Sequence, residues 1–191
     1  MNIGIYGGSF NPIHRGHIAL ARQIRRKAHL DEVWFMVSPL NPLKADRGDL
    51  LPGELRLALV RKALEGEEGL VACDYEFHLP RPSYTWDTLQ ALSRDFPQHT
   101  FTLVIGADNW LVFDRWAHTA DIIAHYPIVI YPREGSPIDV DALPESVRLL
   151  QMPLYNVSST DVRQRIREGR PVRRLLPKNA YDDIVEAYQG K

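Results

Sequence analysis

The first eighteen residues constrain the fold of this chain more than any other segment. A short β-branched run, Ile3–Tyr6, ends in the paired glycines Gly7-Gly8, and a polar turn follows. The residues His14-Arg15-Gly16-His17 then stand where a helix is predicted to begin. A strand, a glycine-rich turn and a helix N-terminus in this order bind anionic phosphate, because free backbone N–H groups point at the ligand. We therefore predict an active site here, and it carries two imidazoles.

The rest of the chain alternates strand-length apolar runs with segments of helical periodicity. The further strands are predicted at Val33–Val37, Leu70–Cys73, Phe101–Ile105, Ile128–Tyr131 and Val147–Leu150. Strand, helix and strand within about thirty residues form a βαβ unit, whose strands are parallel. The prediction is α/β: a Rossmann-like doubly wound parallel sheet with helices on both faces. We expect one domain over residues 1–191, with C-terminal helices in residues 157–191.

Local residue types predict where the helices begin. Hydroxyl groups within Ser83–Asp87 are available as N-caps for a helix that follows. Ser158 and Asp161 fit a capping box, with Ser158 as the N-cap. Asn179 is predicted to cap the last helix, and Arg56 is predicted to be an exposed charge on the helix of residues 54–64.

Composition limits the classes of partner. The chain has 23 Lys and Arg against 24 Asp and Glu, so its charge gives no support for binding nucleic acid. Its one cysteine, Cys73, cannot form an internal disulfide and suits a reducing compartment. No run approaches the ~18 apolar residues of a membrane span, and the N-terminus does not resemble a signal peptide. We expect a cytoplasmic protein with no nucleic-acid or membrane partner.

Ligands of an open parallel sheet bind beyond the carboxyl ends of its strands. The loops predicted at those ends are Gly7–His17, Ser38–Gly53 and Gly106–Trp116, joined by the segment from Val157. The first loop lacks both the dinucleotide fingerprint and the Gly-Lys-Ser/Thr of a P-loop. A zinc site would need at least three protein ligands, and no other histidine has the spacing to supply the third. Histidines without a functional role remain the other alternative.

Two motifs carry a family resemblance. Gly7–His17 resembles the HxGH signature of the nucleotidyltransferase superfamily, and Ser158–Arg163 resembles its second signature, usually written ISSTxxR. Within the superfamily the chain is most similar to bacterial nicotinate-nucleotide adenylyltransferases. That similarity rests on Ser38–Lys44, on Pro82–Leu89, and on Ile105–Asp108 with Phe113 and Trp116. Two residues depart from the family pattern: Asn11, where many members carry Asp, and Trp86, where an aliphatic residue is more usual.

The resemblance implies adenylyl transfer from ATP to nicotinate mononucleotide, which gives nicotinate adenine dinucleotide and pyrophosphate in NAD biosynthesis. The implied catalytic residues are His14, His17, Lys44 and Arg163. The implied ATP-binding residues are Gly8, Ser9, Phe10, Gly16, Gly106, Asp108, Ser158 and Ser159. The implied nicotinate mononucleotide-binding residues are Ser38, Thr85, Trp86 and Trp116, with the amides of Thr85 and Trp86 receiving the nicotinate carboxylate. Mg²⁺ is expected on the ATP phosphates, with no metal ligand from the protein, and the chain is a possible homo-oligomer.

Other interpretations of these residues stay open. Ser158 could only cap its helix, Lys44 could be a solvated loop charge, and Trp86 and Trp116 could be core residues. The chain could also be another adenylyl- or cytidylyltransferase of the superfamily, such as one acting on phosphopantetheine. A non-catalytic nucleotide-binding regulator is the alternative from another class.

Overall fold

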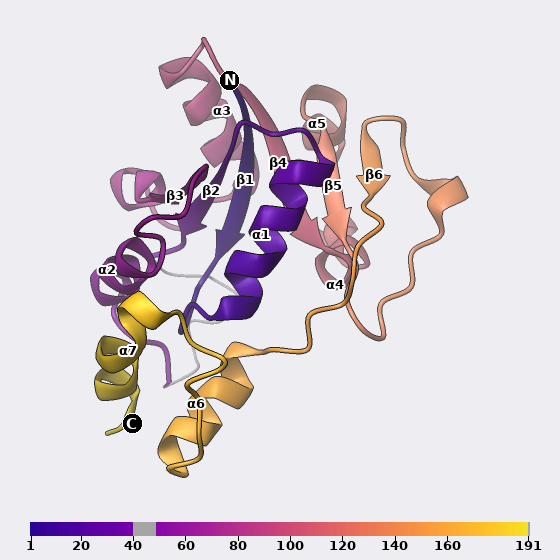
Figure 1. Cartoon of the computed structure of the whole chain (residues 1–191). Coiled ribbons are helices and arrows are strands. Elements are labelled where there is room, and N and C mark those ends of the chain that lie inside the picture. Colours follow the sequence, from indigo (N-terminus) through magenta and orange to yellow (C-terminus); the bar gives the residue numbers. More distant parts are fainter. Residues whose placement is uncertain (40–48, 191) are drawn as a thin grey trace.

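A single parallel sheet organises the molecule (Figure 1). The computed structural model describes residues 1–39 and 49–190, so Lys44 lies outside the described residues. The strand order is β3-β2-β1-β4-β5-β6, and every neighbouring pair is parallel. The strands are β1 (Asn2–Gly8), β2 (Glu32–Val37), β3 (Leu70–Cys73), β4 (Thr100–Gly106), β5 (Ile128–Tyr131) and β6 (Val147–Leu149). The predicted doubly wound sheet is confirmed.

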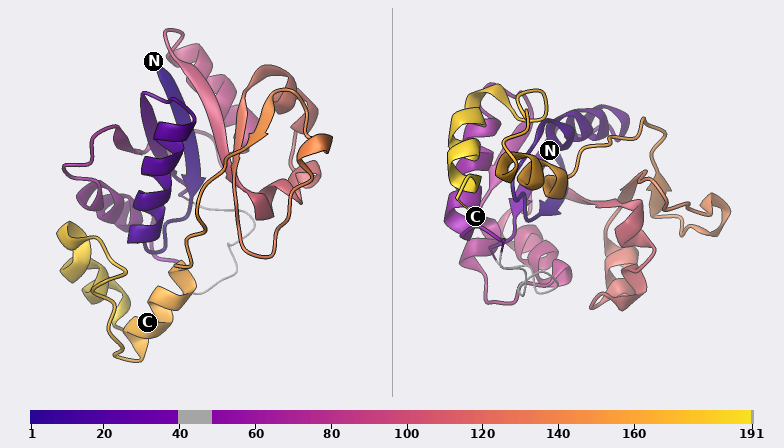
Figure 2. Two further views of the ribbon diagram at one scale, coloured as in Figure 1. Left: turned by 45° about the vertical axis from the view of Figure 1, so that its right-hand side comes forward. Right: turned by 90° about the horizontal axis from the view of Figure 1, so that it is seen from below.

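Helices cover both faces of this sheet (Figure 2). The first face carries α1 (Arg15–Lys27) and α2 (Gly53–Ala63). The helices α6 (Ser159–Arg167) and α7 (Tyr181–Tyr188) lie beyond the carboxyl ends of the strands in Figure 1 and contribute to the same core cluster. The second face carries α3 (Thr85–Asp95), α4 (Ala107–Trp110) and α5 (Thr119–His125). Short 3₁₀ turns complete the connections: η1 (Tyr75–His78), η2 (Phe113–Arg115), η3 (Val140–Ala142) and η4 (Lys178–Ala180).

The core divides between the two faces because alternate residues of a strand point to opposite sides. In β1, Tyr6 packs in the cluster that contains α1 and α7, whereas Ile3 and Ile5 pack in the cluster that contains α3 and α5. These residues are at most 4% exposed. Tyr6 therefore fixes the end of β1 against the helix that carries the two histidines.

Two predicted helix caps are wrong. The N-cap of α7 is Ala180, because η4 precedes that helix, and the amide of Asn179 instead donates to the Glu65 carbonyl at 3.0 Å. The N-cap of α3 is Tyr84, and no side-chain hydroxyl caps it. The Ser158 cap is confirmed, since its Oγ accepts from the backbone N–H of Asp161 at 3.1 Å. Asp161 pairs with Arg165.

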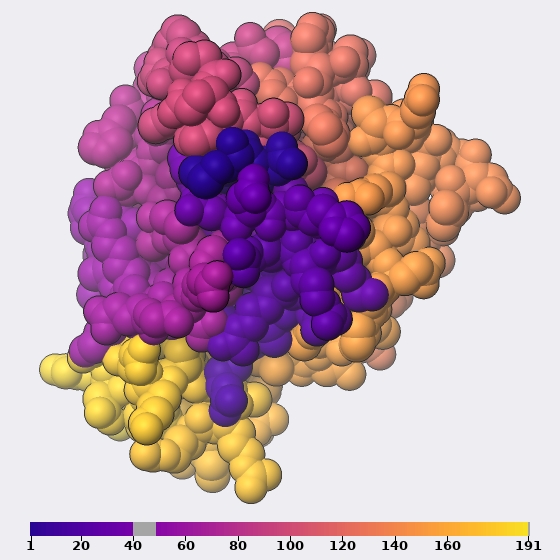
Figure 3. All heavy atoms as spheres, turned by 45° about the horizontal axis from the view of Figure 1, so that its top comes forward, coloured from indigo at the N-terminus to yellow at the C-terminus, as the bar shows by residue number. Residues whose placement is uncertain are grey.

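The surface is uneven. In Figure 3 the segment that contains η3 projects beside β6, while the C-terminal residues gather at the opposite lower edge. Within the described part of the chain, no helix is long and apolar enough to cross a membrane.

Candidate active site

One cavity lies at the carboxyl ends of β1, β4 and β5, where the strand order reverses. The chain adds β2 and β3 on one side of β1 and then crosses to β4 on the other side. A crevice outside the sheet forms at such a reversal. The cavity has a volume of about 350 Å³ and brings both sequence signatures together. Its lining includes Gly8, Ser9, Phe10, His14, Gly16, His17, Asp108, Arg133, Ser158, Ser159 and Arg163.

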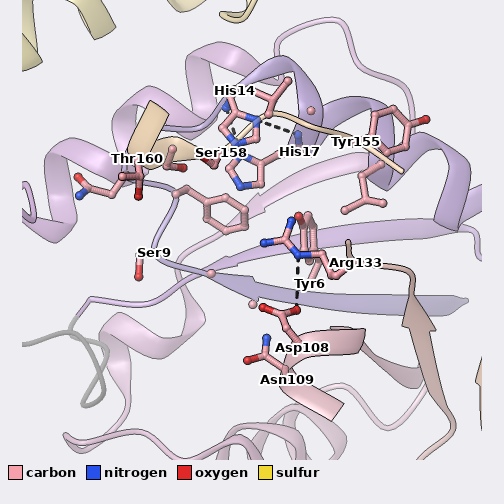
Figure 4. A pocket seen from close by; sticks show the side chains of 18 of the residues that line it. Tyr6, Ser9, His14, His17, Asp108, Asn109, Arg133, Tyr155, Ser158 and Thr160 are labelled. Carbon is pink, nitrogen blue, oxygen red and sulfur yellow. Dashed lines mark hydrogen bonds and ion pairs between the residues drawn. The ribbon is translucent and has the colours of Figure 1, made fainter. Parts of the chain in front are cut away.

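The two histidines form a reciprocal cap at the start of α1. His14 is the N-cap, and its Nδ1 accepts from the backbone N–H of His17 at 3.3 Å. The Nδ1 atom of His17 accepts from the backbone N–H of His14 at 3.1 Å. A nitrogen that accepts a hydrogen bond from an amide carries no proton, so each ring has its proton on Nε2. The rings stack with centroids 3.6 Å apart, and they present two Nε2–H donors side by side (Figure 4).

His14 is electrically neutral at physiological pH. Its side chain is buried, and burial lowers its pKa to about 3, with the nearby charge of Arg133 as a further cause. An imidazole in this state donates a hydrogen bond from Nε2 without carrying a full positive charge. The glycine between the histidines leaves little room for a side chain: a Cβ on Gly16 would lie 3.0 Å from the His14 ring and 3.2 Å from Val157, so these side chains would have to shift.

The second signature holds the first one in place. The hydroxyl of Ser159 donates to the Pro12 carbonyl at 2.9 Å, and an Arg163 Nη1–H donates to the Asn11 carbonyl at 2.8 Å. Arg163 also pairs with Asp49 at 2.6 Å. The ion pair and the two backbone contacts lock the glycine-rich turn from the side of α6. Ser159 and Arg163, two of the predicted catalytic and ATP-binding residues, therefore also have structural contacts.

Two buried polar atoms of the cavity are available to a ligand. Within the described residues, Ser9 Oγ and Arg163 Nε are buried and have no hydrogen-bond partner. Both residues line the cavity and are less than a tenth exposed. A buried donor without a partner costs free energy, so such groups in a cavity are satisfied by ordered water or by a bound ligand. A phosphate oxygen accepts from both types of donor.

The floor of the cavity comes from β4 and β5. Asp108 follows β4, and its carboxylate pairs with Arg133 at 3.5 Å (Figure 4). Gly106 does not line the cavity; it lies beneath Asp108, and a Cβ there would meet the Asp108 carboxylate at 2.5 Å and the Tyr131 ring at 3.1 Å. Sequence reasoning missed Arg133. The available signal was its position two residues after the fifth predicted strand, at the edge where ligands bind.

Arg56 corrects the prediction of an exposed helix charge. Its side chain is 0% exposed, and it donates to four backbone carbonyls at 2.6 to 2.9 Å. The acceptors are the carbonyls of Ser9, Ser38, Pro39 and Leu51. Arg56 therefore ties the glycine-rich turn to the end of β2 and to the start of α2. The misreading arose because an arginine with neutral acceptors leaves no acidic partner visible in the sequence.

The residues predicted for the mononucleotide lie outside the cavity lining. Ser38 follows β2, and its N–H donates to the Gly8 carbonyl at 3.0 Å. Thr85 and Trp86 open α3, and the Trp86 ring stacks on His118 with centroids 5.9 Å apart. Trp116 packs against Phe113. Their predicted roles remain predictions.

Comparison with known proteins identifies the family. A family model described as cytidylyltransferase-like matches residues 5–165. A protein of Bacteroides thetaiotaomicron is 48% identical over 186 residues, covering 97% of this chain and 92% of its own length. A protein of Bacteroides fragilis is 46% identical over 183 residues, with 96% and 90% covered. Both are named "Probable nicotinate-nucleotide adenylyltransferase". The chain belongs to the cytidylyltransferase-like family of nucleotidyltransferases. Its relatives place it among the nicotinate-nucleotide adenylyltransferases.

Solved structures share the fold at lower identity. The Plasmodium falciparum nicotinic acid mononucleotide adenylyltransferase complexed with NaAD has a TM-score of 0.80 at 20% identity, covering 97% of this chain and 95% of that one. The same enzyme complexed with APC gives a TM-score of 0.78 at 20% identity, with 97% and 94% covered. This likeness independently confirms the Rossmann-like sheet.

Proposed function

We propose that this protein transfers the adenylyl group of ATP to nicotinate mononucleotide, releasing pyrophosphate. One observation carries the proposal for the donor side: two stacked imidazoles with fixed Nε2–H groups share a cavity with the unsatisfied Ser9 Oγ and Arg163 Nε. These donors suit a polyphosphate. The names of the relatives support the acceptor.

The proposed reaction requires alignment of the two phosphate reactants and stabilisation of the charge on their oxygens. A phosphate oxygen of the mononucleotide attacks the α-phosphorus of ATP, and the bond from that phosphorus to the bridging oxygen of pyrophosphate breaks. The electron pair leaves with pyrophosphate, and no proton has to be removed from the attacking oxygen when it is ionised. Catalysis is then mainly positioning plus stabilisation of charge on the phosphoryl oxygens. Neutral His14 and the neighbouring His17 supply preorganised dipoles for that charge.

Mg²⁺ would bind to the ATP phosphates and to water. Within the described part of the chain, no group of three or more His, Cys, Asp or Glu side chains is placed to hold a metal ion. A triphosphate brings its own oxygen ligands, and Mg²⁺ commonly keeps several waters. When bound, it would neutralise charge on the phosphates. Lys44 is proposed to add a cation from outside the described residues.

The acceptor side is proposed at the first turn of α3. The backbone N–H groups of Thr85 and Trp86 belong to the first helical turn, which leaves them without intrahelical partners. A nicotinate carboxylate would accept hydrogen bonds from them. Ser38 and Trp116 would complete this side, Trp116 by stacking on the pyridine ring.

A pyrophosphate-release assay tests the proposal. ATP and Mg²⁺ are supplied with nicotinate mononucleotide, nicotinamide mononucleotide or phosphopantetheine, each in a separate reaction. The expected result is pyrophosphate release with nicotinate mononucleotide at a kcat/KM well above that for the amide. Preference for the amide would contradict the role of the α3 amides. Preference for phosphopantetheine would contradict the proposed acceptor, and no release with any acceptor would favour a non-catalytic regulator.

A further inference from the structure

A partly buried carboxyl group lies between the two segments assigned to the acceptor. Glu76 lies in η1, between β3 and α3. The Thr88 hydroxyl lies 3.1 Å from Glu76 Oε1, and the Ser38 side chain is close enough to lower the pKa of the same carboxyl group. Ser38 stands at the end of β2, and Thr88 lies one turn after Thr85 in α3. A single side chain therefore spans the end of β2 and the beginning of α3.

Ser38 is fixed from two directions. Its backbone N–H donates to the Gly8 carbonyl at 3.0 Å, and its carbonyl accepts from Arg56 at 2.8 Å. These bonds attach its main chain to the glycine-rich turn of the donor site. Glu76 lies between the Ser38 side chain and Thr88 of α3. The carboxyl group thus bridges the donor site to the helix turn proposed for the nicotinate carboxylate.

The proton on Glu76 decides which hydrogen bonds Thr88 makes. Thr88 Oγ1 lies within reach of both Glu76 Oε1 and the Tyr84 carbonyl, at 3.1 and 3.2 Å. A hydroxyl has one proton to donate. When Glu76 is ionised, Thr88 donates to it and loses the bond to Tyr84. When Glu76 is protonated, it can donate to Thr88, and Thr88 is free to donate to Tyr84, the N-cap of α3.

Both states of Glu76 are accessible near neutral pH. Burial raises its pKa to about 7, and the bonds from Thr88 and Ser38 offset only part of that rise. Cys73, at the end of β3, stays neutral because burial raises its thiol pKa to about 11. Asp74 pairs with Arg61 at 2.8 Å, and Asp87 in α3 is exposed.

We propose that Glu76 is a positioning residue for the acceptor: its carboxyl group sets the first turn of α3 against Ser38, and its protonated form favours binding of the acidic mononucleotide. This inference rests on the proposed function, which puts an anionic ring substituent at that turn. The protonated carboxyl keeps the Tyr84 bond and adds no negative charge beside the incoming carboxylate. The ionised form does neither.

The test measures KM for nicotinate mononucleotide and for ATP between pH 6 and pH 8.5. The enzymes are the wild type, Glu76→Gln, Glu76→Ala and the control Glu145→Gln, which makes the same chemical change at an exposed site. Glutamine mimics the protonated carboxyl, since its amide donates to Thr88. Titration of the substrate phosphate affects every variant equally, so it cancels in the ratio of each variant to the wild type.

Between pH 6 and pH 8.5, the KM for nicotinate mononucleotide is expected to rise in the wild type and in Glu145→Gln. The factor of this rise is expected to be about five times the factor in Glu76→Gln. Glu76→Ala is expected to raise the acceptor KM about tenfold at every pH while the ATP KM stays within about twofold. An acceptor KM in Glu76→Gln that follows the wild-type pH profile would overturn the proposal, even if Glu76→Ala failed to fold. Equal effects of Glu76→Ala on both KM values would also overturn it. A wild-type chain inactive on nicotinate mononucleotide would instead refute the proposed function, and the Glu76 inference with it.

Discussion

The hydroxyl of Tyr188, in the last helix, donates to the side-chain oxygen of Asn11 at 2.6 Å. The same oxygen accepts from the backbone N–H of Leu51 at 3.2 Å, and the Asn11 amide donates to the Asp49 carbonyl at 3.0 Å. One side chain therefore joins the glycine-rich turn, residues 49–51 and α7. An aspartate has no N–H to offer to the Asp49 carbonyl, which gives a physical reason for asparagine at a position where many family members carry Asp.

Asn11→Asp is expected to lower the free energy of unfolding by about 1–3 kcal/mol, because it removes a buried donor and leaves the Asp49 carbonyl unsatisfied. Urea denaturation measures the change. Asn156→Asp makes the same chemical change at an exposed residue and should have little effect. Equal stability of the two variants would show that the Asn11 amide is not needed.

Arg56→Lys is expected to destabilise the protein by about 2–4 kcal/mol. The planar guanidinium of arginine donates to four carbonyls, and the compact ammonium group of lysine cannot reach all of them. Burial already lowers the pKa of Arg56, so any loss of hydrogen bonds leaves a poorly solvated charge. The matched control is Arg61→Lys on the exposed side of the same helix. A shift in the urea midpoint of Arg56→Lys no larger than that of Arg61→Lys would contradict this role.

The central strands β1, β4 and β5 were predictable because they are buried on both faces and therefore appear as continuous apolar runs. The segments that line the cavity were predictable because the His14–His17 turn and Ser158 combine residues typical of a helix start with groups that suit a phosphate. The roles of these residues stay predictions. Local sequence carried both signals. The position of Lys44 is not among the described residues, so its assignment stays a prediction.

Arg56, Glu76 and Arg133 were not identified as parts of the site from sequence. Each depends on contacts with elements distant in the chain, such as the bond from Arg56 to the Ser9 carbonyl 47 residues away. Charge type alone favours exposure, and Arg56 departs from this preference because tertiary contacts supply buried carbonyl partners. The predicted cap at Asn179 was wrong for a similar reason, because its side-chain amide donates to the distant Glu65 carbonyl and does not cap α7.

His14→Asn separates the structural role of the first histidine from its proposed catalytic one. Asparagine is a favourable N-cap and can still accept from the His17 N–H, but it lacks the Nε2–H donor. The variant should keep most of its thermal stability while kcat falls by about 10²–10³-fold, the usual cost of removing one preorganised donor. Measurement of Tm together with kcat checks both parts. Near-normal turnover would remove His14 from phosphate contact.

Stability should fall in acid because of His14. Its folded pKa of about 3 lies below its ordinary value of 6.5, so the unfolded chain binds the proton more readily between these values. Its contribution to stability is therefore complete above about pH 6.5 and is lost as the pH falls toward 3, with a slope of at most about 1.4 kcal/mol per pH unit. Urea unfolding of the wild type and of His14→Asn between pH 4 and pH 7 measures the difference in slope. The control His78→Asn, at an exposed histidine, should retain the wild-type slope.

Arg133→Gln is expected to raise the KM for ATP about tenfold and to change kcat little. Arg133 faces the cavity, and its pair with Asp108 is long and half-exposed, so the guanidinium is only weakly held and can turn to a phosphate or ribose oxygen. Its loss should also raise the pKa of His14, but burial, the larger cause, still keeps that ring neutral at pH 7. Steady-state kinetics with varied ATP measures the effect, and Arg115→Gln, an exposed arginine of η2, is the matched control. An ATP KM equal to that of Arg115→Gln would show that the Arg133 side chain does not contact the nucleotide.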